Sequence, residues 1–156
     1  MIPVVSHIIE VVVFRVHNDR PEYLIMRRAM HERVHPGMWQ IITGMVEERE
    51  TGREAAVREL HEEAGLVAKH LWSLPLVNSF YDIVRDTVNM CPVFAVQADP
   101  GAVVTISEEH MTSEWLPLAP AKARLVWPGH REAVDMVEQY IVRGGEVAER
   151  LMIRLS

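Results

Sequence analysis

Acidic side chains are concentrated in one short segment, residues 44–66, which reads GMVEERETGREAAVRELHEEAGL. Residues 52–64 within it are rich in good helix formers and contain no proline. At about 100° per residue, Glu59, Glu62 and Glu63 fall within one sector of such a helix. Three like charges this close repel one another unless a cation lies among them. Oxygen-only ligands suit Mg²⁺ or Mn²⁺, so the spacing indicates a divalent ion shared with the phosphates of a substrate.

The two ends of this helix are marked by residue type. Thr51 and Glu54 have the spacing of a capping box, in which each side chain bonds the backbone N–H of the other residue. Gly65 suits the left-handed position that commonly ends a helix. The sequence therefore predicts a helix over residues 52–64.

Glutamates also occupy many solvated helix faces, so three of them alone do not define a site. The loop before the helix argues against that alternative, because Gly44 and Glu50 lie at fixed offsets from the helix. The whole segment follows the pattern G-x5-E-x7-R-E-U-x-E-E-x-G-U, where U is apolar. Every fixed position is matched, by Gly44, Glu50, Arg58, Glu59, Leu60, Glu62, Glu63, Gly65 and Leu66.

This pattern resembles the signature box of the Nudix hydrolases, which cleave nucleoside diphosphates linked to another moiety. The resemblance implies a single α/β domain over residues 1–156, built as an α/β/α sandwich around a mixed β-sheet. The box, residues 44–66, would form a loop, a helix and a second loop. The implied reaction is attack of water on a phosphorus of a pyrophosphate linkage, with Mg²⁺, or alternatively Mn²⁺, as cofactor.

The resemblance also implies roles for the box residues. Glu59, Glu62 and Glu63 would be metal ligands, and Glu63 would position or deprotonate the attacking water. Arg58 would hold the carboxylates in place through charge-assisted hydrogen bonds. Gly44, which has no side chain, would let a backbone carbonyl approach the metal.

The box departs from the family at one position. Arg49 stands where the family often has glycine, directly before Glu50, which is expected to brace the loop. The departure concerns the local turn and not the metal ligands.

One more acidic residue is expected from a loop distant in sequence, as in many relatives. Glu109, within the segment Ser107-Glu108-Glu109-His110, is the candidate for a further metal ligand or base. A solvated acidic turn is the alternative for this segment. His110 could assist, although a histidine is more often a surface or packing residue.

Three residues ahead of the box are candidates for binding the substrate. Adjacent strand residues point to opposite faces, so only one of Arg27 and Arg28 can face the site. We choose Arg28 for a phosphate contact, with a surface salt bridge as the alternative. Trp39 could stack on a base, although core packing would also explain it. Gln40, its neighbour, is a further candidate for substrate binding.

The element Trp39-Gln40, followed by Thr43-Gly44, is similar to a narrower group of relatives, as is the spacing from Glu109-His110 to Trp115-Leu116. That group hydrolyses dATP or dihydroneopterin triphosphate to a monophosphate and pyrophosphate. Other substrates with the same linkage remain open: dinucleoside polyphosphates, nucleotide sugars and oxidised nucleotides. A nucleotide-binding module without catalysis is also open, although none of the metal glutamates is substituted.

Composition narrows the class of partner. The chain has 156 residues, is 49% hydrophobic and carries a net charge of −6, which argues against a general nucleic-acid-binding surface. A small nucleotide or pterin triphosphate is the expected partner. Its single cysteine, Cys91, cannot form an internal disulfide, so a cytoplasmic location is expected. No apolar run approaches the length of a membrane span, so no membrane partner is expected.

Hydrophobic patterning predicts the remaining elements. Strands are expected over residues 8–16, 22–28, 39–42, 66–80 with a break near Pro75, 88–97 and 114–118. A short helix or a turn is expected over residues 120–126, and an amphipathic helix over residues 131–142. The tail, residues 150–156, alternates between apolar and other residues and would form an edge strand or a contact with a second copy, which makes a homodimer compatible with the sequence.

Overall fold

The computed structural model describes residues 1–155. Its strands are β1 (Val4–Val5), β2 (Ile8–His17), β3 (Arg20–Arg28), β4 (Trp39–Gln40), β5 (Ile42–Met45), β6 (His70–Asp82), β7 (Thr87–Gln97), β8 (His110–Leu116) and β9 (Met152–Ile153). Its helices are α1 (Gly52–Ala64), α2 (Leu118–Arg124), α3 (Pro128–Met136) and α4 (Glu146–Leu151), and a π-helical segment, η1 (Val137–Val142), continues α3. Among the described residues, no helix has the length and apolar character needed to cross a membrane.

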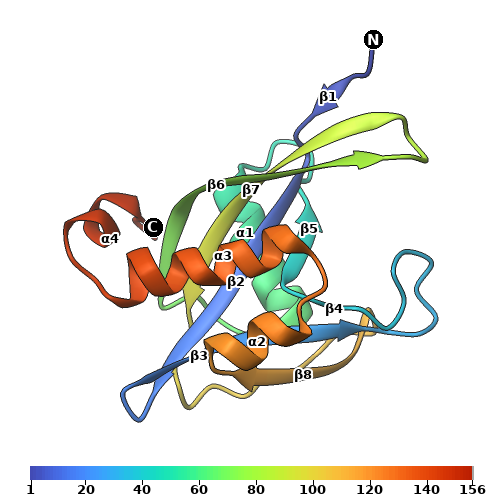
Figure 1. The fold of residues 1–156 in the computed structure, drawn as a ribbon. Coiled ribbons are helices and arrows are strands. Elements are labelled where there is room, and N and C mark those ends of the chain that lie inside the picture. The colour runs from blue at the N-terminus through green and yellow to red at the C-terminus, as the bar shows by residue number, and fades with distance from the viewer. Residues whose placement is uncertain (156) are drawn as a thin grey trace.

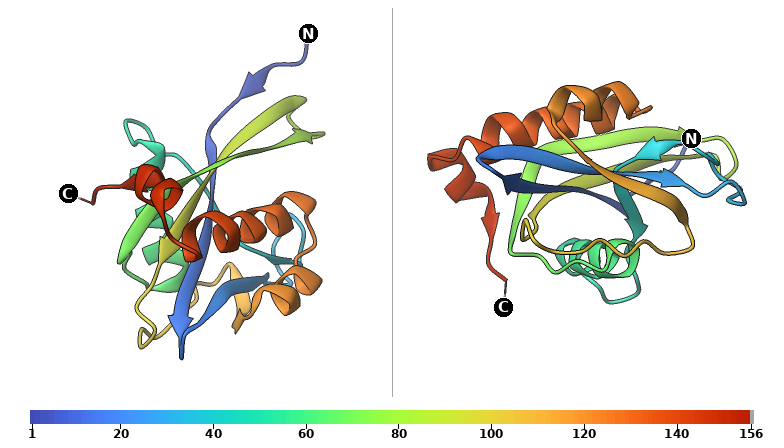
Figure 2. Two further views of the ribbon diagram at one scale, coloured as in Figure 1. Left: turned by 60° about the vertical axis from the view of Figure 1, so that its left-hand side comes forward. Right: turned by 90° about the horizontal axis from the view of Figure 1, so that it is seen from below.

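The strands form one mixed sheet (Figure 1). The main path runs β4-β3-β2-β7-β6-β9, while β1 pairs with β7, β5 with β2 and β8 with β3. The pairs β1–β7 and β2–β7 are parallel and the others are antiparallel. Helix α1 covers one face, and α2 and α3 cover the other (Figure 2). The predicted α/β/α sandwich around a mixed sheet is confirmed.

The apolar run in β2 supplies both faces of the core, because successive strand residues point to opposite sides. Val11 and Val13 pack in the cluster that includes α1. Val12 and Phe14 pack in the cluster that includes α2 and α3. A strand that is buried on both sides reads as a continuous apolar segment, which is the pattern of β2.

The predicted elements around the box are found with small changes in their bounds. Helix α1 has the bounds predicted for it. The expected break at Pro75 is a shift in register between Ser73 and Val77 within one long strand. Strand β8 begins four residues before the predicted start at residue 114, because its pairing with β3 extends to Arg28 opposite His110.

The C-terminal part departs more from the predicted elements. The helix expected over residues 131–142 begins earlier, at Pro128, and its second half is π-helical. The predicted tail strand is largely wrong, because α4 extends to Leu151 and, in the described part of the tail, only Met152–Ile153 pair with β6. Ser156, the last residue of that predicted strand, lies outside the described residues.

A buried polar contact fixes the start of α3 against the sheet. Glu10 interrupts the apolar run of β2 on the α3 side, and its carboxylate accepts a 2.6 Å hydrogen bond from the Asn78 amide. His130 in α3 places Nε2 3.6 Å from the same carboxylate. Gly129 lies so close to β6 that a Cβ added there would be 2.6 Å from Asn78 Oδ1. The approach of α3 to the sheet therefore requires glycine at residue 129.

We predict that Gly129→Ala lowers the free energy of unfolding by about 1–3 kcal/mol, because the new methyl group must displace the Asn78 amide from Glu10. Urea denaturation measures the change. Gly101→Ala is the matched control, since its added Cβ meets only an ordinary contact at 3.5 Å, and it should change stability by no more than about 0.5 kcal/mol. Equal effects of the two substitutions would contradict this view of the α3 contact.

Candidate active site

Helix α1 is fixed at both ends by the residues that the sequence indicated. Thr51 Oγ1 accepts a hydrogen bond from the Glu54 backbone N–H, and the Glu54 carboxylate accepts one from the Thr51 backbone N–H. Gly65 ends the helix with a left-handed φ of 65°. Ala55 and Leu60 are fully buried against the sheet. This packing sets the rotation of the helix and turns Glu59 and Glu63 toward the sheet edge.

Arg58 gathers the carboxylates at the outer side of the site. Its guanidinium binds both oxygens of Glu50, at 2.8 and 2.9 Å, and also donates to Glu59 at 2.9 Å and Glu62 at 3.1 Å. A fifth hydrogen bond reaches the backbone carbonyl of Met45 at 2.8 Å. These carboxylates raise the pKa of Arg58 above its usual value, and the hydrogen bonds from Arg58 lower the pKa of Glu50. Arg58 thus ties α1 to the preceding loop and to β5.

Gly44 lies against Glu59 with no room for a side chain. A Cβ at residue 44 would be 2.2 Å from the carboxyl carbon of Glu59. The absence of a side chain therefore brings the Glu59 carboxylate directly against the backbone of β5. This is a steric reason for glycine, beside the expected approach of its carbonyl to a metal.

Glu63 is the most enclosed carboxylate of the site, with 4% of its surface exposed. Within residues 1–155, its Oε2 atom has no hydrogen-bond partner. Burial, together with the nearby carboxylates of Glu59 and Glu109, raises the pKa of Glu63 to about 10. Without a cation, Glu63 therefore holds a proton at neutral pH.

Glu109 reaches this site from the segment before β8. One carboxylate oxygen each of Glu63 and Glu109 and one ring nitrogen of His110 lie within 4.8 Å of one another. Glu62, by contrast, is exposed and turns its carboxylate to Arg58. The structure thus brings together Glu59, Glu63 and Glu109, with Glu62 at the solvent side.

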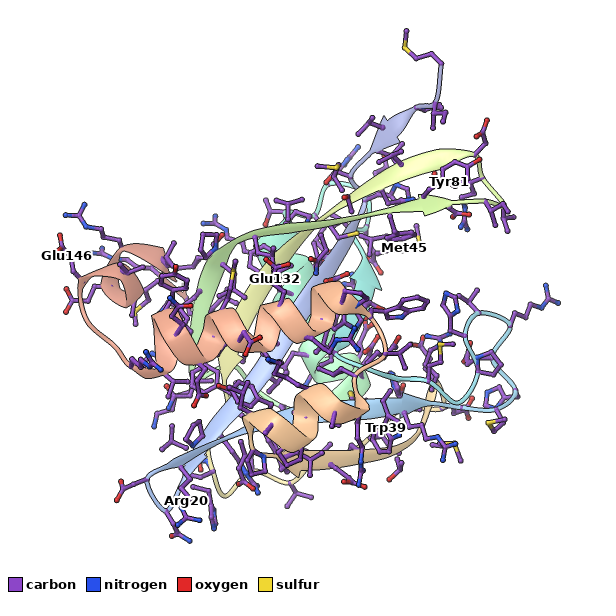
Figure 3. The ribbon with its side chains drawn as sticks, in the orientation of Figure 1. Arg20, Trp39, Met45, Tyr81, Glu132 and Glu146 are labelled. Carbon is purple, nitrogen blue, oxygen red and sulfur yellow. The ribbon has the colours of Figure 1, made fainter. Side chains whose placement is uncertain are left out.

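The three candidates for substrate binding lie in different places. Arg28 pairs with His110 between β3 and β8, but its guanidinium is engaged by Glu32 and the Val34 carbonyl, at 3.2 and 2.6 Å. Gln40 is buried and lies 3.3 Å from His110 Nε2, beside the acidic cluster. Trp39 packs on the opposite face of the sheet, near α2, with the Arg124 guanidinium 5.1 Å from its ring centre (Figure 3). The contact of Trp39 with a base stays a prediction.

Two features of the site were not predicted from the sequence. His110 was assigned only an assisting role, yet it is as buried as Glu63, and burial lowers its pKa to about 4. In the sequence, the feature that points to a role for His110 in the site is its position next to Glu109. Arg49 adopts a left-handed φ of 67°, so the turn usually made by glycine is kept with an arginine.

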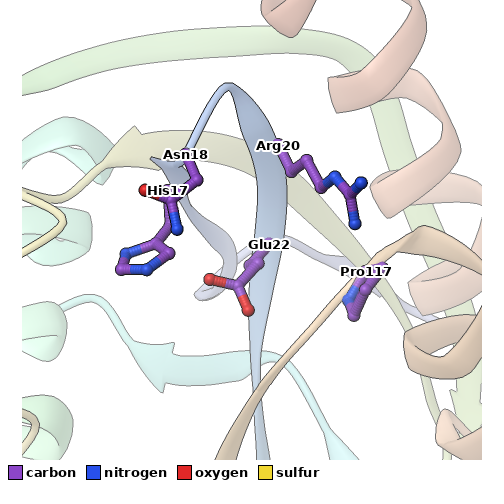
Figure 4. Close-up of a pocket in the computed structure, with 5 residues that line it drawn as sticks. All are labelled: His17, Asn18, Arg20, Glu22 and Pro117. Carbon is purple, nitrogen blue, oxygen red and sulfur yellow. The ribbon is translucent and has the colours of Figure 1, made fainter.

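A separate hollow of about 460 Å³ lies at the turn between β2 and β3 (Figure 4). His17, Asn18, Arg20, Glu22 and Pro117 line it. This hollow is at the opposite end of β2 and β3 from Arg28 and Ile9, and it contains none of the box carboxylates. It is therefore not part of the site built around α1.

Comparison with known proteins assigns the family. Residues 6–137 match the family model of the NUDIX domain, so the chain belongs to the Nudix family. With its fold and its complete box, it is a Nudix hydrolase, an enzyme class that generally uses divalent cations such as Mg²⁺.

The chain is similar to individual proteins that have different named activities. The chain is 36% identical over 105 residues to "Octanoyltransferase" of Myxococcus xanthus; the match takes in 63% of this chain but only 28% of that protein. The E. coli dihydroneopterin triphosphate pyrophosphohydrolase superposes with a TM-score of 0.68 and 26% identity, covering 91% of this chain and 97% of that one. A C. elegans Ap4A hydrolase in a binary complex superposes with a TM-score of 0.73 and 18% identity, covering 90% and 99%.

We predict that, in the absence of metal, the unchanged protein loses stability relative to Glu63→Gln as the pH rises. The difference in unfolding free energy between Glu63→Gln and the unchanged protein should therefore increase with pH. The Glu63 carboxyl has its pKa raised from 4.5 to about 10 on folding, so the folded protein binds a proton that the unfolded chain releases above about pH 4.5. Its contribution to stability is complete below that pH and falls as the pH rises, by at most about 1.4 kcal/mol per unit. The Gln variant lacks this loss.

Urea denaturation in EDTA from about pH 5 to about pH 9 measures the difference between the two proteins. Parallel stability profiles across that range would show that Glu63 ionises normally. At the alkaline end of that range, saturating Mg²⁺ should reverse the order of stability, because the Glu63 carboxylate binds the ion more tightly than the amide of Glu63→Gln and a bound ion stabilises the folded protein.

Proposed function

We propose that this Nudix hydrolase is a Mg²⁺-dependent pyrophosphohydrolase whose substrate is a dATP-like nucleoside triphosphate or dihydroneopterin triphosphate. The products would be a monophosphate and pyrophosphate. The observation that carries the proposal is the convergence of Glu59, Glu63 and Glu109 beside Gly44. The similarity to the E. coli dihydroneopterin triphosphate pyrophosphohydrolase, at 26% identity over nearly the whole chain, supports the choice of substrate.

The residues of the site fit a divalent cation. A buried carboxylate oxygen of Glu63 lacks a partner within the described chain, and an uncompensated buried polar atom is costly. Oxygen donors are offered by the carbonyl of Gly44 and by Glu59, Glu62, Glu63 and Glu109, which suits Mg²⁺, with Mn²⁺ as the alternative. When bound, the cation would supply positive charge to the phosphate oxygens.

The chemistry assigned to the chain is positioning and proton transfer. Glu63 would hold a water molecule in line with the phosphorus–oxygen bond to be broken, and Glu63 or Glu109 would accept the proton of that water. The new bond joins the water oxygen to phosphorus, and the bridging oxygen leaves with the pyrophosphate. Arg58 acts through the carboxylates that it orients and does not touch the substrate.

Arg28, Gln40 and Trp39 would bind the substrate. Gln40 is closest to the acidic cluster and would meet the phosphates, whereas Arg28 would have to leave Glu32 to do so. Trp39 lies on the face of the sheet opposite the acidic cluster, so a base could reach it only if the substrate extended around the edge of the sheet. Dinucleoside polyphosphates, nucleotide sugars and oxidised nucleotides contain the same linkage, so they are the alternative substrates.

We predict that Glu63→Gln lowers turnover by about 10²- to 10⁴-fold while the protein stays folded, because the uncharged amide holds the cation less tightly than the carboxylate and cannot accept a proton. Pyrophosphate release from dATP with Mg²⁺ measures it. Glu48→Gln is the control, since Glu48 is an exposed glutamate of the same loop and should retain normal turnover. Near-normal turnover of Glu63→Gln would refute the proposed role.

A substrate panel decides between the candidates. Nucleoside triphosphates, dihydroneopterin triphosphate, a dinucleoside tetraphosphate and nucleotide sugars would be compared by kcat/KM, with ¹⁸O-labelled water to locate the attacked phosphorus. The proposal expects the highest value for a triphosphate that releases pyrophosphate. A higher value for a dinucleoside polyphosphate or a nucleotide sugar would replace the proposed substrate.

A further inference from the structure

His110 brings an imidazole ring beside the carboxylates of Glu63 and Glu109. It is the first residue of β8 and pairs with Arg28 of β3, on the side of the sheet that faces α1. Only 4% of its surface is exposed. One of its ring nitrogens lies within 4.8 Å of carboxylate oxygens of Glu63 and Glu109.

The two ring nitrogens of His110 have different surroundings. Nε2 faces the Gln40 side-chain amide at 3.3 Å. Nδ1 is buried and has no hydrogen-bond partner in the described part of the chain. Glu63 Oε2, in the same cluster, is likewise buried without a partner. Two such atoms in one cluster require a common explanation, because buried polar groups are normally paired.

We propose that His110 is a nitrogen ligand of a divalent cation held jointly with Glu63 and Glu109, which gives this position a preference for a transition metal such as Mn²⁺ over Mg²⁺. The inference rests on the proposed function and refines it, since the cation is the one that the hydrolysis would use. A single ion among these three residues would satisfy both buried atoms at once.

Gln40 is placed to leave Nδ1 free for such an ion. A metal-ligating histidine usually donates its other ring N–H to a nearby acceptor, which fixes the tautomer. The Gln40 amide presents an oxygen to Nε2 when it is turned by a half rotation, and the two ends of an amide have nearly the same shape. Nε2 would then donate to Gln40, and the lone pair of the unpartnered Nδ1 would be free to bind the ion.

The mixed ligand set determines the expected metal preference. Mg²⁺ favours oxygen ligands and gives up its water reluctantly. Divalent transition metals accept imidazole nitrogen, and their affinity for nitrogen-containing sites rises from Mn²⁺ onward in the series. A site built only from carboxylates accepts both Mg²⁺ and Mn²⁺, so loss of the imidazole should weaken Mn²⁺ binding more than Mg²⁺ binding.

The test is pulsed electron paramagnetic resonance on the full chain loaded with Mn²⁺. A directly bound imidazole should give a ¹⁴N coupling to the Mn²⁺ electron spin, and His110→Gln should abolish it. His61→Gln is the matched control, because His61 is an exposed histidine on α1, and it should keep the coupling. Labelling of the unchanged protein with ¹⁵N-histidine should convert the signal to that of ¹⁵N, which needs no variant.

Metal affinity provides the second readout. His110→Gln should weaken Mn²⁺ binding by roughly tenfold or more, and Mg²⁺ binding by less than about threefold. Bound Mn²⁺ without nitrogen coupling, or a coupling that persists in His110→Gln, would overturn this inference and leave the proposed hydrolase intact. Failure of the unchanged protein to bind Mn²⁺ or Mg²⁺, with or without dATP, would overturn both.

Discussion

Repulsion among carboxylates on one helical turn is the constraint on which the site depends. Arg58 offsets part of it by binding Glu50, Glu59 and Glu62 with one guanidinium. One positive charge does not balance three negative charges, so the site keeps an excess of negative charge. Glu63 lies on the buried side of this group of carboxylates, and its pKa is raised. The arrangement is therefore stable in two ways, with a proton on Glu63 or with a cation among the carboxylates.

The sandwich keeps these carboxylates close together. The small side chains of α1 allow the helix to lie against the sheet, and Gly44 allows Glu59 to contact the backbone of β5. Pairing of β8 with β3 carries Glu109 and His110 to the same place from far along the chain. On the other face, Glu10 ties α3 to the sheet, so both layers are fixed by polar contacts as well as by apolar packing.

Local spacing was sufficient to predict the box. The capping box and the helix bounds depend on residues within one segment, and both were found as expected. Of the three glutamates expected on one sector of α1, Glu59 and Glu63 are buried, whereas Glu62 is exposed beside Arg58. The convergence of Glu109 with the box was expected only through the family resemblance, because strand pairing between distant segments leaves little trace in one sequence. The same limit applies to β8, whose start is set by Arg28 on another strand.

Elements that depend on tertiary context were predicted less well. The π-helical segment and α4 replace a simple helix and a tail strand. The face on which Trp39 lies follows from the register of β4 with β3, and a shift of one residue would have reversed it. The residues of the box likewise do not predict which base or pterin is bound, since they are expected to contact the phosphates and the cation.

The coupling between a proton and a cation at Glu63 is the central claim, and calorimetry of Mg²⁺ binding tests it most directly. Titrations at about pH 8 in two buffers of different ionisation enthalpy give the number of protons released. Because the pKa of Glu63 is raised to about 10, the account predicts release of nearly one proton per chain as Mg²⁺ binds. Binding of Mg²⁺ with no release of protons would contradict it.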